Sequence, residues 1–566
     1  MKNKNIQDNI LLQVINVTLI VIVFNFSPID YECDGSNTLL TSKFIYHLLF
    51  TNDPIVASYS YRAPVYKVVQ VFSGTFFLDS FSPLIFVQII FSILMPSIFY
   101  FTLLNINRGL ALLGSFLFLL SMIPILHLKL ILSLHTMIFF VVLSNYFLIK
   151  FVYQKKIFDF YLAFLTSVML LFTRFDGAFI FLGQVLILSY YLFKTNLEFK
   201  AKLSHILKSY SFVVLTLCLW MTIKALAVLN LSVLTPIKFL QSFTSLNQQT
   251  GAQLFWSLNN GIRQHVNAKY SYETNSVEFI DNLLIKSNGP SSEKLYNHLK
   301  IFFEKKDIIE HLSFYEDKMP PIFPKNKKMT PFEVYNNHYG NFFDDTSKIT
   351  DNIFNKDFES LYYPLHIPGF LNHMYGKTKS DRLLLGASLE IIANNPEVQK
   401  NFLKNFIKSY SSLKNLESLF KEYPMGHSTS WYNLKIFNAG NCPQTSLSPK
   451  MFDEYESQYN KNSNSPTSIV IGNIANTHKN ILRSLIGPSI LILFIFIFYT
   501  NKPFLISVLF VSYNATLIFL SVMGSKVVGT KSENYTLVIG LIIVIFLLSG
   551  LLNFLKRRFK IFEVNK

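Results

Sequence analysis

The chain has 566 residues, of which 51% are hydrophobic and 15% charged, and its formal net charge is +17. Soluble domains carry about 25% charged residues, so this composition indicates a membrane protein and excludes a soluble enzyme and a disordered scaffold. Many Lys and Arg residues stand in short segments between apolar runs, where basic residues report membrane orientation. We therefore expect the lipid bilayer, and no nucleic acid, as a partner.

Apolar runs long enough to cross a ~30 Å hydrocarbon core recur towards both ends of the sequence. They predict an all-α polytopic membrane protein with a bundle of about ten transmembrane helices. The first run is expected to be a retained helix, because no small-residue cleavage pattern precedes Asp30. The predicted crossings lie near 10–27, 84–104, 109–128, 130–149, 157–173, 178–193, 211–231, 480–499, 503–523 and 536–555.

Lys and Arg residues are distributed unevenly over the two sides of these crossings. If the N terminus is cytoplasmic, the short inner segments hold sixteen of them and the short outer segments hold seven. The positive-inside rule then places both termini in the cytoplasm and residues 28–83 and 232–479 outside. We expect a multi-pass protein, in a bacterial inner membrane, whose active site faces the periplasm or the exterior.

The two outer segments divide the chain into three parts. Residues 1–231 are expected to form an N-terminal transmembrane catalytic module that includes the outer loop 28–83. Residues 232–479 are expected to form a large, mainly helical extracytoplasmic domain. Residues 480–566 complete the chain with C-terminal transmembrane helices and a basic cytoplasmic tail.

Helical periodicity supports the assignment of the large outer domain. Asn395 is suited to cap a helix whose first residue is Pro396, followed by apolar residues at helical spacing. Shorter helical patterns lie near 276–286 and 293–312. Pro and Asp residues punctuate 313–365, which predicts loops there.

Three carboxylates, Asp30, Glu32 and Asp34, stand directly after the first predicted helix. In an extended segment alternate side chains share a face, so these three could converge on a substrate or on a divalent cation. The alternative is a solvated acidic turn at the membrane edge. We expect no cofactor and no zinc, because the twelve His residues show no close ligand set.

A basic and aromatic segment, Tyr59-Ser-Tyr-Arg62-Ala-Pro-Val-Tyr-Lys67, follows in the same outer loop. Between the acidic and basic segments, residues 38–50 have an amphipathic pattern suited to a helix on the membrane surface. Cations beside a carboxylate suit an anionic substrate that carries a displaceable group. Cys33 and Cys442 are both expected outside, where a disulfide could join the loop to the large domain.

The order of an acidic residue after the first helix, an interfacial helix and a basic-X-Pro element resembles the polytopic type C glycosyltransferases. The likeness is closest to the branch of lipid A aminoarabinose transferases and protein O-mannosyltransferases. In that family an Asp or Glu at the start of the first outer loop is the catalytic base, and Asp34 matches this position. The resemblance covers residues 10–230 by motif order, and 480–556 by layout.

Three further motifs follow in the family's order. His135 stands where the family often has Ser and Glu, which leaves its role open. Thr173-Arg174-Phe-Asp176 resembles a short outer turn of the family, although Arg174 and Asp176 could instead pair with each other. Glu533-Asn-Tyr535 stands where many members have Arg before the Tyr, so a cationic role there would pass to Lys531 or be absent.

The resemblance implies an inverting glycosyltransferase that moves one sugar from a polyprenyl-phosphate carrier to an extracytoplasmic lipid, glycan or protein. Asp34 would accept the proton of the acceptor hydroxyl, while Arg62 stabilises the leaving lipid phosphate. A divalent metal is not required, because basic side chains can neutralise this phosphate. The further substrate-binding candidates are Lys67, Arg174, Asp176, Lys224 and Tyr535, with snorkelling to the outer face as the alternative for Lys224.

Two other classes of function stay open at this point. A transporter or lipid flippase would use intramembrane charges to line a path, but the sequence has no inverted repeat and no matching pair of broken helices. A polysaccharide polymerase or ligase would share the lipid donor and transfer an oligosaccharide.

Overall fold

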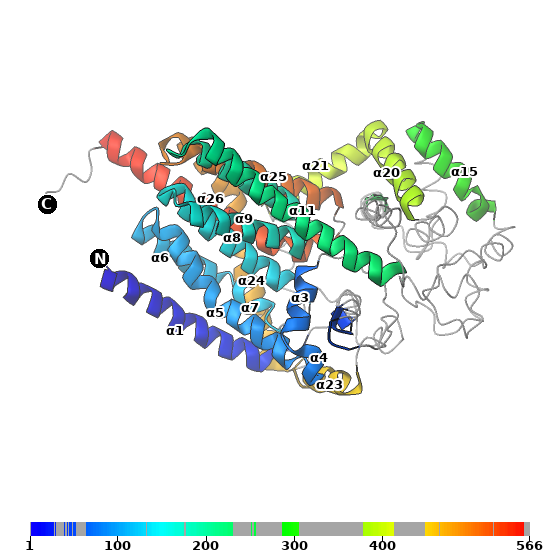
Figure 1. Ribbon diagram of the computed structural model, residues 1–566, viewed down its shortest axis with the longest axis horizontal. Coiled ribbons are helices and arrows are strands. Elements are labelled where there is room, and N and C mark those ends of the chain that lie inside the picture. The colour runs from blue at the N-terminus through cyan, green and yellow to red at the C-terminus, as the bar shows by residue number, and fades with distance from the viewer. Residues whose placement is uncertain are drawn as a thin grey trace.

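The computed structural model describes most of the bundle and parts of the outer segments, and the regular structure in these residues is all helical, with no strand (Figure 1). The fold class is therefore all-α, as predicted. The described residues are 2–27, 64–131, 133–174, 177–229, 286–304, 377–411, 448–462, 465–523 and 526–559, with isolated residues between 29 and 51 and between 251 and 258.

Among the described residues, seven helical segments are long and apolar enough to cross a membrane, which supports a multi-pass membrane protein. Each of the ten predicted crossings coincides with a helix. Three of these are shorter apolar segments: α9 (Ile157–Thr173), α10 (Ala178–Phe193) and residues 503–519 of α25 (Pro503–Met523). The long segments are α1 (Lys2–Phe26), α5 (Ser82–Leu104), α6 (Arg108–Leu120) with α7 (Ile123–Leu126), α8 (Leu134–Gln154), α11 (Phe199–Leu229), α24 (Pro466–Leu493) with η6 (Phe494–Tyr499), and α26 (Lys526–Phe559).

Local signals explain where several helices begin. The side chain of Asn107 accepts hydrogen bonds from the backbone N–H groups of Gly109 (2.8 Å) and Leu110 (3.3 Å), so it caps α6. Pro residues occupy the first turns of α5, α7 and α24, where the missing N–H group costs no hydrogen bond. The sequence therefore specifies the entry of these helices locally.

The fourth predicted crossing starts before its helix does. The fourth crossing was expected from residue 130, but α8 begins at Leu134. Residues 123–126 form α7, and a turn precedes α8. Met122 has a left-handed backbone (φ 57°), so the chain changes direction after α6 instead of continuing as one apolar helix.

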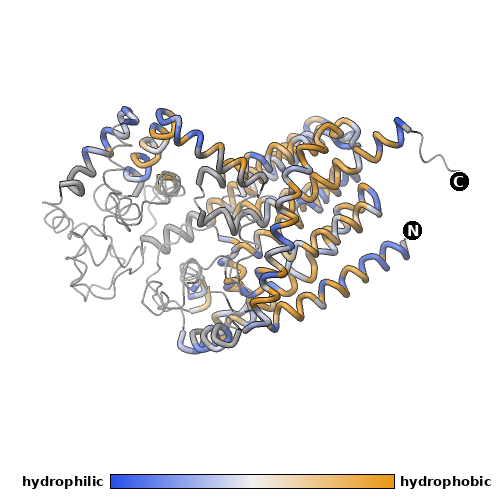
Figure 2. Tube along the Cα trace, turned by 180° about the vertical axis from the view of Figure 1, so that it is seen from behind, coloured by the Kyte–Doolittle hydropathy of each residue, from blue (hydrophilic) through white to orange (hydrophobic). Residues whose placement is uncertain are grey.

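The core of the bundle lies around α8 and α26. Helix α8 packs against α5, α9, α10 and α26, and residues 535–547 of α26 form a buried apolar run. Large apolar side chains of α1, α11 and α24 are exposed instead, including Ile10, Val214 and Ile492. Figure 2 shows hydrophobic residues along the length of the bundle and hydrophilic ones at both termini, which is the pattern of a lipid-facing surface.

The beginning of α1 and the end of α26 lie at the same end of the bundle (Figure 1). This end is called the inner end below, following the predicted orientation. Short helices gather at the opposite, outer end: α3 (Val65–Phe72), α4 (Thr75–Leu78) and α23 (Pro449–Asn462). Gly74, with φ 93°, turns the chain between α3 and α4.

Besides α23, the large outer segment contains α15 (Pro290–Glu304), α20 (Lys377–Asn394) and α21 (Pro396–Ser411) among its described residues. The predicted helix starting at Pro396 is confirmed, and α15 confirms the pattern near 293–312 in part. Glu390 of α20 accepts hydrogen bonds from the backbone N–H groups of Ser291 (3.0 Å) and Ser292 (2.7 Å), at the start of α15. Although burial opposes it, this pairing holds the pKa of the Glu390 carboxyl below its usual value.

Candidate functional site

The outer end of the bundle contains α3, a helix of eight residues whose buried positions are mainly polar. Tyr66, Lys67, Gln70 and Val71 are buried, at the spacing of one helical face. Lys67 is 0% exposed. Because burial of an ammonium group is costly unless it is compensated, a lysine at this position requires favourable partners.

Trp220 of α11 provides one such partner. The Nζ atom of Lys67 lies 4.8 Å from the ring centroid of Trp220, within the range of a cation–π interaction. Ile45 and Val71 join Trp220 in the same buried cluster. The residues of 38–50 that the structure describes are helical, and they pack on α3.

Helix α3 also contacts α9. Arg174 follows the last residue of α9, and its N–H donates a hydrogen bond to the carbonyl of Leu170 (3.3 Å). Lys224 lies in α11, one turn beyond Trp220. The fold therefore brings Lys67 and the backbone positions of Arg174 and Lys224 to the outer end of the bundle.

Gln70 supports the buried face of α3. Its Oε1 atom accepts a hydrogen bond from the Ser42 hydroxyl at 2.5 Å, which ties the interfacial segment to α3. Burial raises the pKa of the neighbouring Tyr66 hydroxyl, so this group stays protonated. Lys67 is consequently held in a helix whose packing is fixed from both sides.

A second buried cation at the outer end, Lys129, joins three segments. Its Nζ atom donates to the carbonyl of Ser27 (3.0 Å) and to Oε1 of Gln458 (3.0 Å), and it lies 4.4 Å from the ring centroid of Phe24. Lys129 therefore connects the end of α1 and the turn before α8 to α23.

Glu454 holds the same helix, α23, against the start of α5. Its carboxylate accepts hydrogen bonds from the Ser80 hydroxyl (2.8 Å), the Phe81 N–H (2.9 Å) and the Ser82 hydroxyl (2.9 Å). These donors lie at the positively polarised end of a helix, where a carboxylate is favourable. Residues near 450 thus close the outer end of the bundle.

His135 lies at the outer end of the fourth crossing, as predicted, and is fully buried. Its Nε2 atom is 3.0 Å from the carbonyl oxygen of Gln88 and 3.2 Å from the Ser92 hydroxyl. These contacts tie α8 to α5. They assign His135 to packing between helices.

Most of the residues proposed for chemistry lie outside the described residues. Asp34, Arg62 and Asp176 belong to this group, as do the candidate metal ligands Asp30 and Glu32. Cys33 and Cys442 also lie outside the described residues. Tyr535 is described, and it is buried in the core at the start of the apolar run of α26. Among the described residues no three His, Cys, Asp or Glu side chains are grouped to hold a metal ion.

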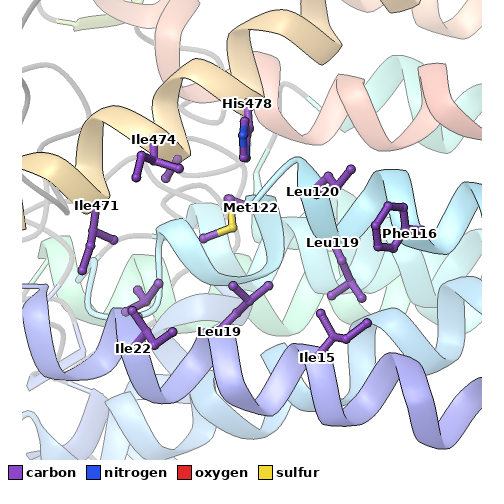
Figure 3. A pocket seen from close by; sticks show the side chains of 12 residues that line it. Ile15, Leu19, Ile22, Phe116, Leu119, Leu120, Met122, Ile471, Ile474 and His478 are labelled. Atoms are coloured by element: carbon purple, nitrogen blue, oxygen red, sulfur yellow. The ribbon is translucent and has the colours of Figure 1, made fainter.

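A cavity of about 240 Å³ lies between α1, α6 and α24 (Figure 3). Its last residue along α1 is Val23, next to Phe24, over which Lys129 lies. The lining is apolar apart from one imidazole, and it includes Ile15, Leu19 and Val23 of α1, Phe116 and Leu119 of α6, and Ile471, Ile474 and His478 of α24.

Sequence reasoning counted Lys129 among the outer basic residues, but it selected neither Lys129 nor Trp220 as a candidate site residue. The signal for Lys129 was its place in the apolar stretch 123–131, where an ionisable residue demands a partner. Its partner Gln458 is 329 positions away, so the sequence alone could not identify it. No family model, curated protein or solved structure matches this chain.

Proposed function

We propose that this protein is an integral-membrane glycosyltransferase that moves one sugar from a polyprenyl-phosphate carrier to an extracytoplasmic acceptor. Asp34 accepts the proton of the acceptor hydroxyl, which attacks the anomeric carbon with inversion. The bond from this carbon to the phosphate oxygen breaks, and the lipid phosphate leaves with the electron pair. Arg62, with Lys67, Arg174 or Lys224 as further cations, stabilises the developing negative charge.

The buried ammonium of Lys67 is the observation that carries this proposal. Burial of an ammonium group against an indole ring carries a desolvation cost, so we expect Lys67 to have a function other than solubility. It lies on the helix that follows Arg62 by three residues and that contacts α9. The same end of the bundle also contains the backbone positions of Arg174, which follows α9, and of Lys224 in α11.

The cavity between α1, α6 and α24 supports a lipid-linked donor. Its apolar lining, with Leu19, Phe116 and Ile474 among the contributors, suits a hydrocarbon chain. A nucleotide sugar would need neither this lining nor an outer-face site, because nucleotide sugars are found in the cytoplasm. The cavity and the buried cation therefore favour the same class of donor.

Mass spectrometry of surface glycans and lipids tests the proposal, in cells with and without this protein. Loss of the protein should remove one sugar residue from a single class of acceptor, and its return should restore that residue. Loss of a whole oligosaccharide would indicate a polymerase or ligase instead. Unchanged glycans together with altered uptake of a solute would contradict the proposal and favour a transporter.

A further inference from the structure

The inner end of the bundle holds three lysines that come from three separate turns. Lys155 follows α8, Lys194 follows α10 and Lys502 precedes α25. Together they are called the inner lysine cluster. Each lies over a tyrosine ring: Lys155 over Tyr191 at 3.9 Å, Lys194 over Tyr190 at 4.6 Å, and Lys502 over Tyr153 at 5.0 Å and Tyr191 at 5.5 Å from the ring centroid.

Lys155 is the most constrained member of the inner lysine cluster. Its backbone is left-handed (φ 58°), and its N–H donates to the carbonyl of Phe151 at 2.8 Å to end α8. Gly or Asn is usual at such a position, so the lysine occupies it against a local conformational preference. Its Nζ atom is buried and has no hydrogen-bond partner among the described residues.

The cluster carries positive charge that no carboxylate among the described residues neutralises. Burial lowers the pKa of Lys155 to about 8, and the charges of Lys502 and Lys194 add to this effect. Asp159, four residues after Lys155 in the sequence, is paired with Lys150 at 2.9 Å. We therefore expect an anion from outside the chain to neutralise the positive charge of the inner lysine cluster.

Apolar side chains border the cluster on the surface of the bundle. Phe193, next to Lys194, is 45% exposed, while Phe158 and Phe199 are each 67% exposed. The rings of Phe193 and Phe199 are 6.2 Å apart. A soluble anion would gain nothing from these rings, whereas the acyl chains of a phospholipid would cover them.

We propose that the inner lysine cluster binds the phosphate of an anionic phospholipid, whose acyl chains lie on the apolar surface beside Phe193. The buried ammonium of Lys155 would complete its hydrogen bonding with the phosphate oxygens. The tyrosine rings under the lysines orient the ammonium groups towards the headgroup region, where aromatic residues are favoured. This inference is independent of the sugar-transfer reaction at the other end of the bundle.

Native mass spectrometry of the purified full chain tests the proposal. The protein is taken from bilayer discs of equal phosphatidylglycerol and phosphatidylcholine into neutral detergent, and the retained lipids are counted. We expect phosphatidylglycerol to be retained preferentially. Lys155→Asn, Lys194→Gln and Lys502→Gln should each reduce its occupancy roughly fivefold, as expected for the loss of one lysine near a bilayer surface.

Lys156→Asn is the matched control, because Lys156 is exposed in the same turn and precedes α9, where Asn is a favourable cap. Asn also tolerates the left-handed backbone at residue 155. If Lys155→Asn does not fold, Lys502→Gln provides a second variant of the cluster. Equal retention of the two lipids, or equal losses in Lys156→Asn and Lys155→Asn, would overturn the proposal. If inorganic phosphate competed for the inner lysine cluster as effectively as phosphatidylglycerol, the ligand would be a soluble anion and the lipid proposal would be wrong.

Discussion

The ammonium of Lys67 lies 4.8 Å from the ring centroid of Trp220, which joins the short outer helix α3 to the long helix α11. The two residues are separated by most of the first membrane module, and both are buried. The contact therefore fixes a cation at the outer end of the bundle. This is where the proposed reaction needs positive charge.

Replacement of Lys67 separates a structural role from a role in phosphate recognition. Lys67→Met keeps the length and the packing of the stem, so a purely structural lysine could be replaced with little loss or with a gain of stability. We expect the thermal midpoint to hold while sugar transfer falls about 10- to 100-fold, because charge-assisted hydrogen bonds contribute roughly 1.5–3 kcal/mol. Lys67→Arg should fall between Lys67→Met and the unchanged protein.

Lys43→Met is the control for that experiment, since Lys43 is a half-buried lysine on the adjacent interfacial segment. It should leave transfer close to normal. Equal sugar-transfer activity of Lys67→Met and Lys43→Met would contradict a role in phosphate recognition and indicate that Lys67 serves only in packing.

The predicted orientation can be tested by labelling with a reagent that does not cross the membrane. Gln154 and Lys379 are both exposed, and they lie on opposite sides in the predicted orientation. In a background without the native cysteines, Lys379→Cys should be labelled in intact cells and Gln154→Cys only after the membrane is opened. Labelling of Gln154→Cys in intact cells would invert the assignment.

Glu454 is expected to stabilise the outer end of the bundle. Glu454→Ala leaves the donors at Ser80, Phe81 and Ser82 without their acceptor, so the free energy of unfolding should fall by about 1–3 kcal/mol. The neighbouring Asp453 is exposed, and Asp453→Ala should change stability little. The thermal midpoints of both variants in the same detergent check this, and equal midpoints would argue against the contact.

The low pKa of Lys155 predicts a pH dependence of stability. The folded protein releases this proton near pH 8, whereas the unfolded chain keeps it until about pH 10.5, so folding is favoured as pH rises through this window. Lys194, Lys502 and Tyr191 face the same ammonium, and they are retained in Lys155→Asn. Between pH 8 and pH 10.5, the thermal midpoint of the unchanged protein should rise relative to that of Lys155→Asn. A difference that is constant with pH would contradict the assigned pKa.

The sequence predicted the helices well because each crossing needs a long apolar run, and such runs are visible without knowledge of the partners. It placed the start of the fourth crossing too early, because the apolar character continues through α7 although the left-handed backbone of Met122 changes the direction of the chain. The site was less accessible to prediction. Lys67 could be selected from its basic and aromatic neighbours, but Trp220 and Gln458 approach from distant segments, and nothing in the local sequence indicates those contacts.

The central claim is that Asp34 acts as the base in sugar transfer, and the most direct test is the amount of sugar-modified acceptor formed in membranes that carry Asp34→Asn. This change keeps the shape of the side chain and removes the proton acceptor. Loss of a general base costs about 10²- to 10⁴-fold in rate, so we expect transfer to collapse while the protein stays inserted. Asp30→Asn, four residues earlier in the same loop, serves as the matched control and should be milder. Full transfer by Asp34→Asn, measured by mass spectrometry of the acceptor, would contradict the mechanism.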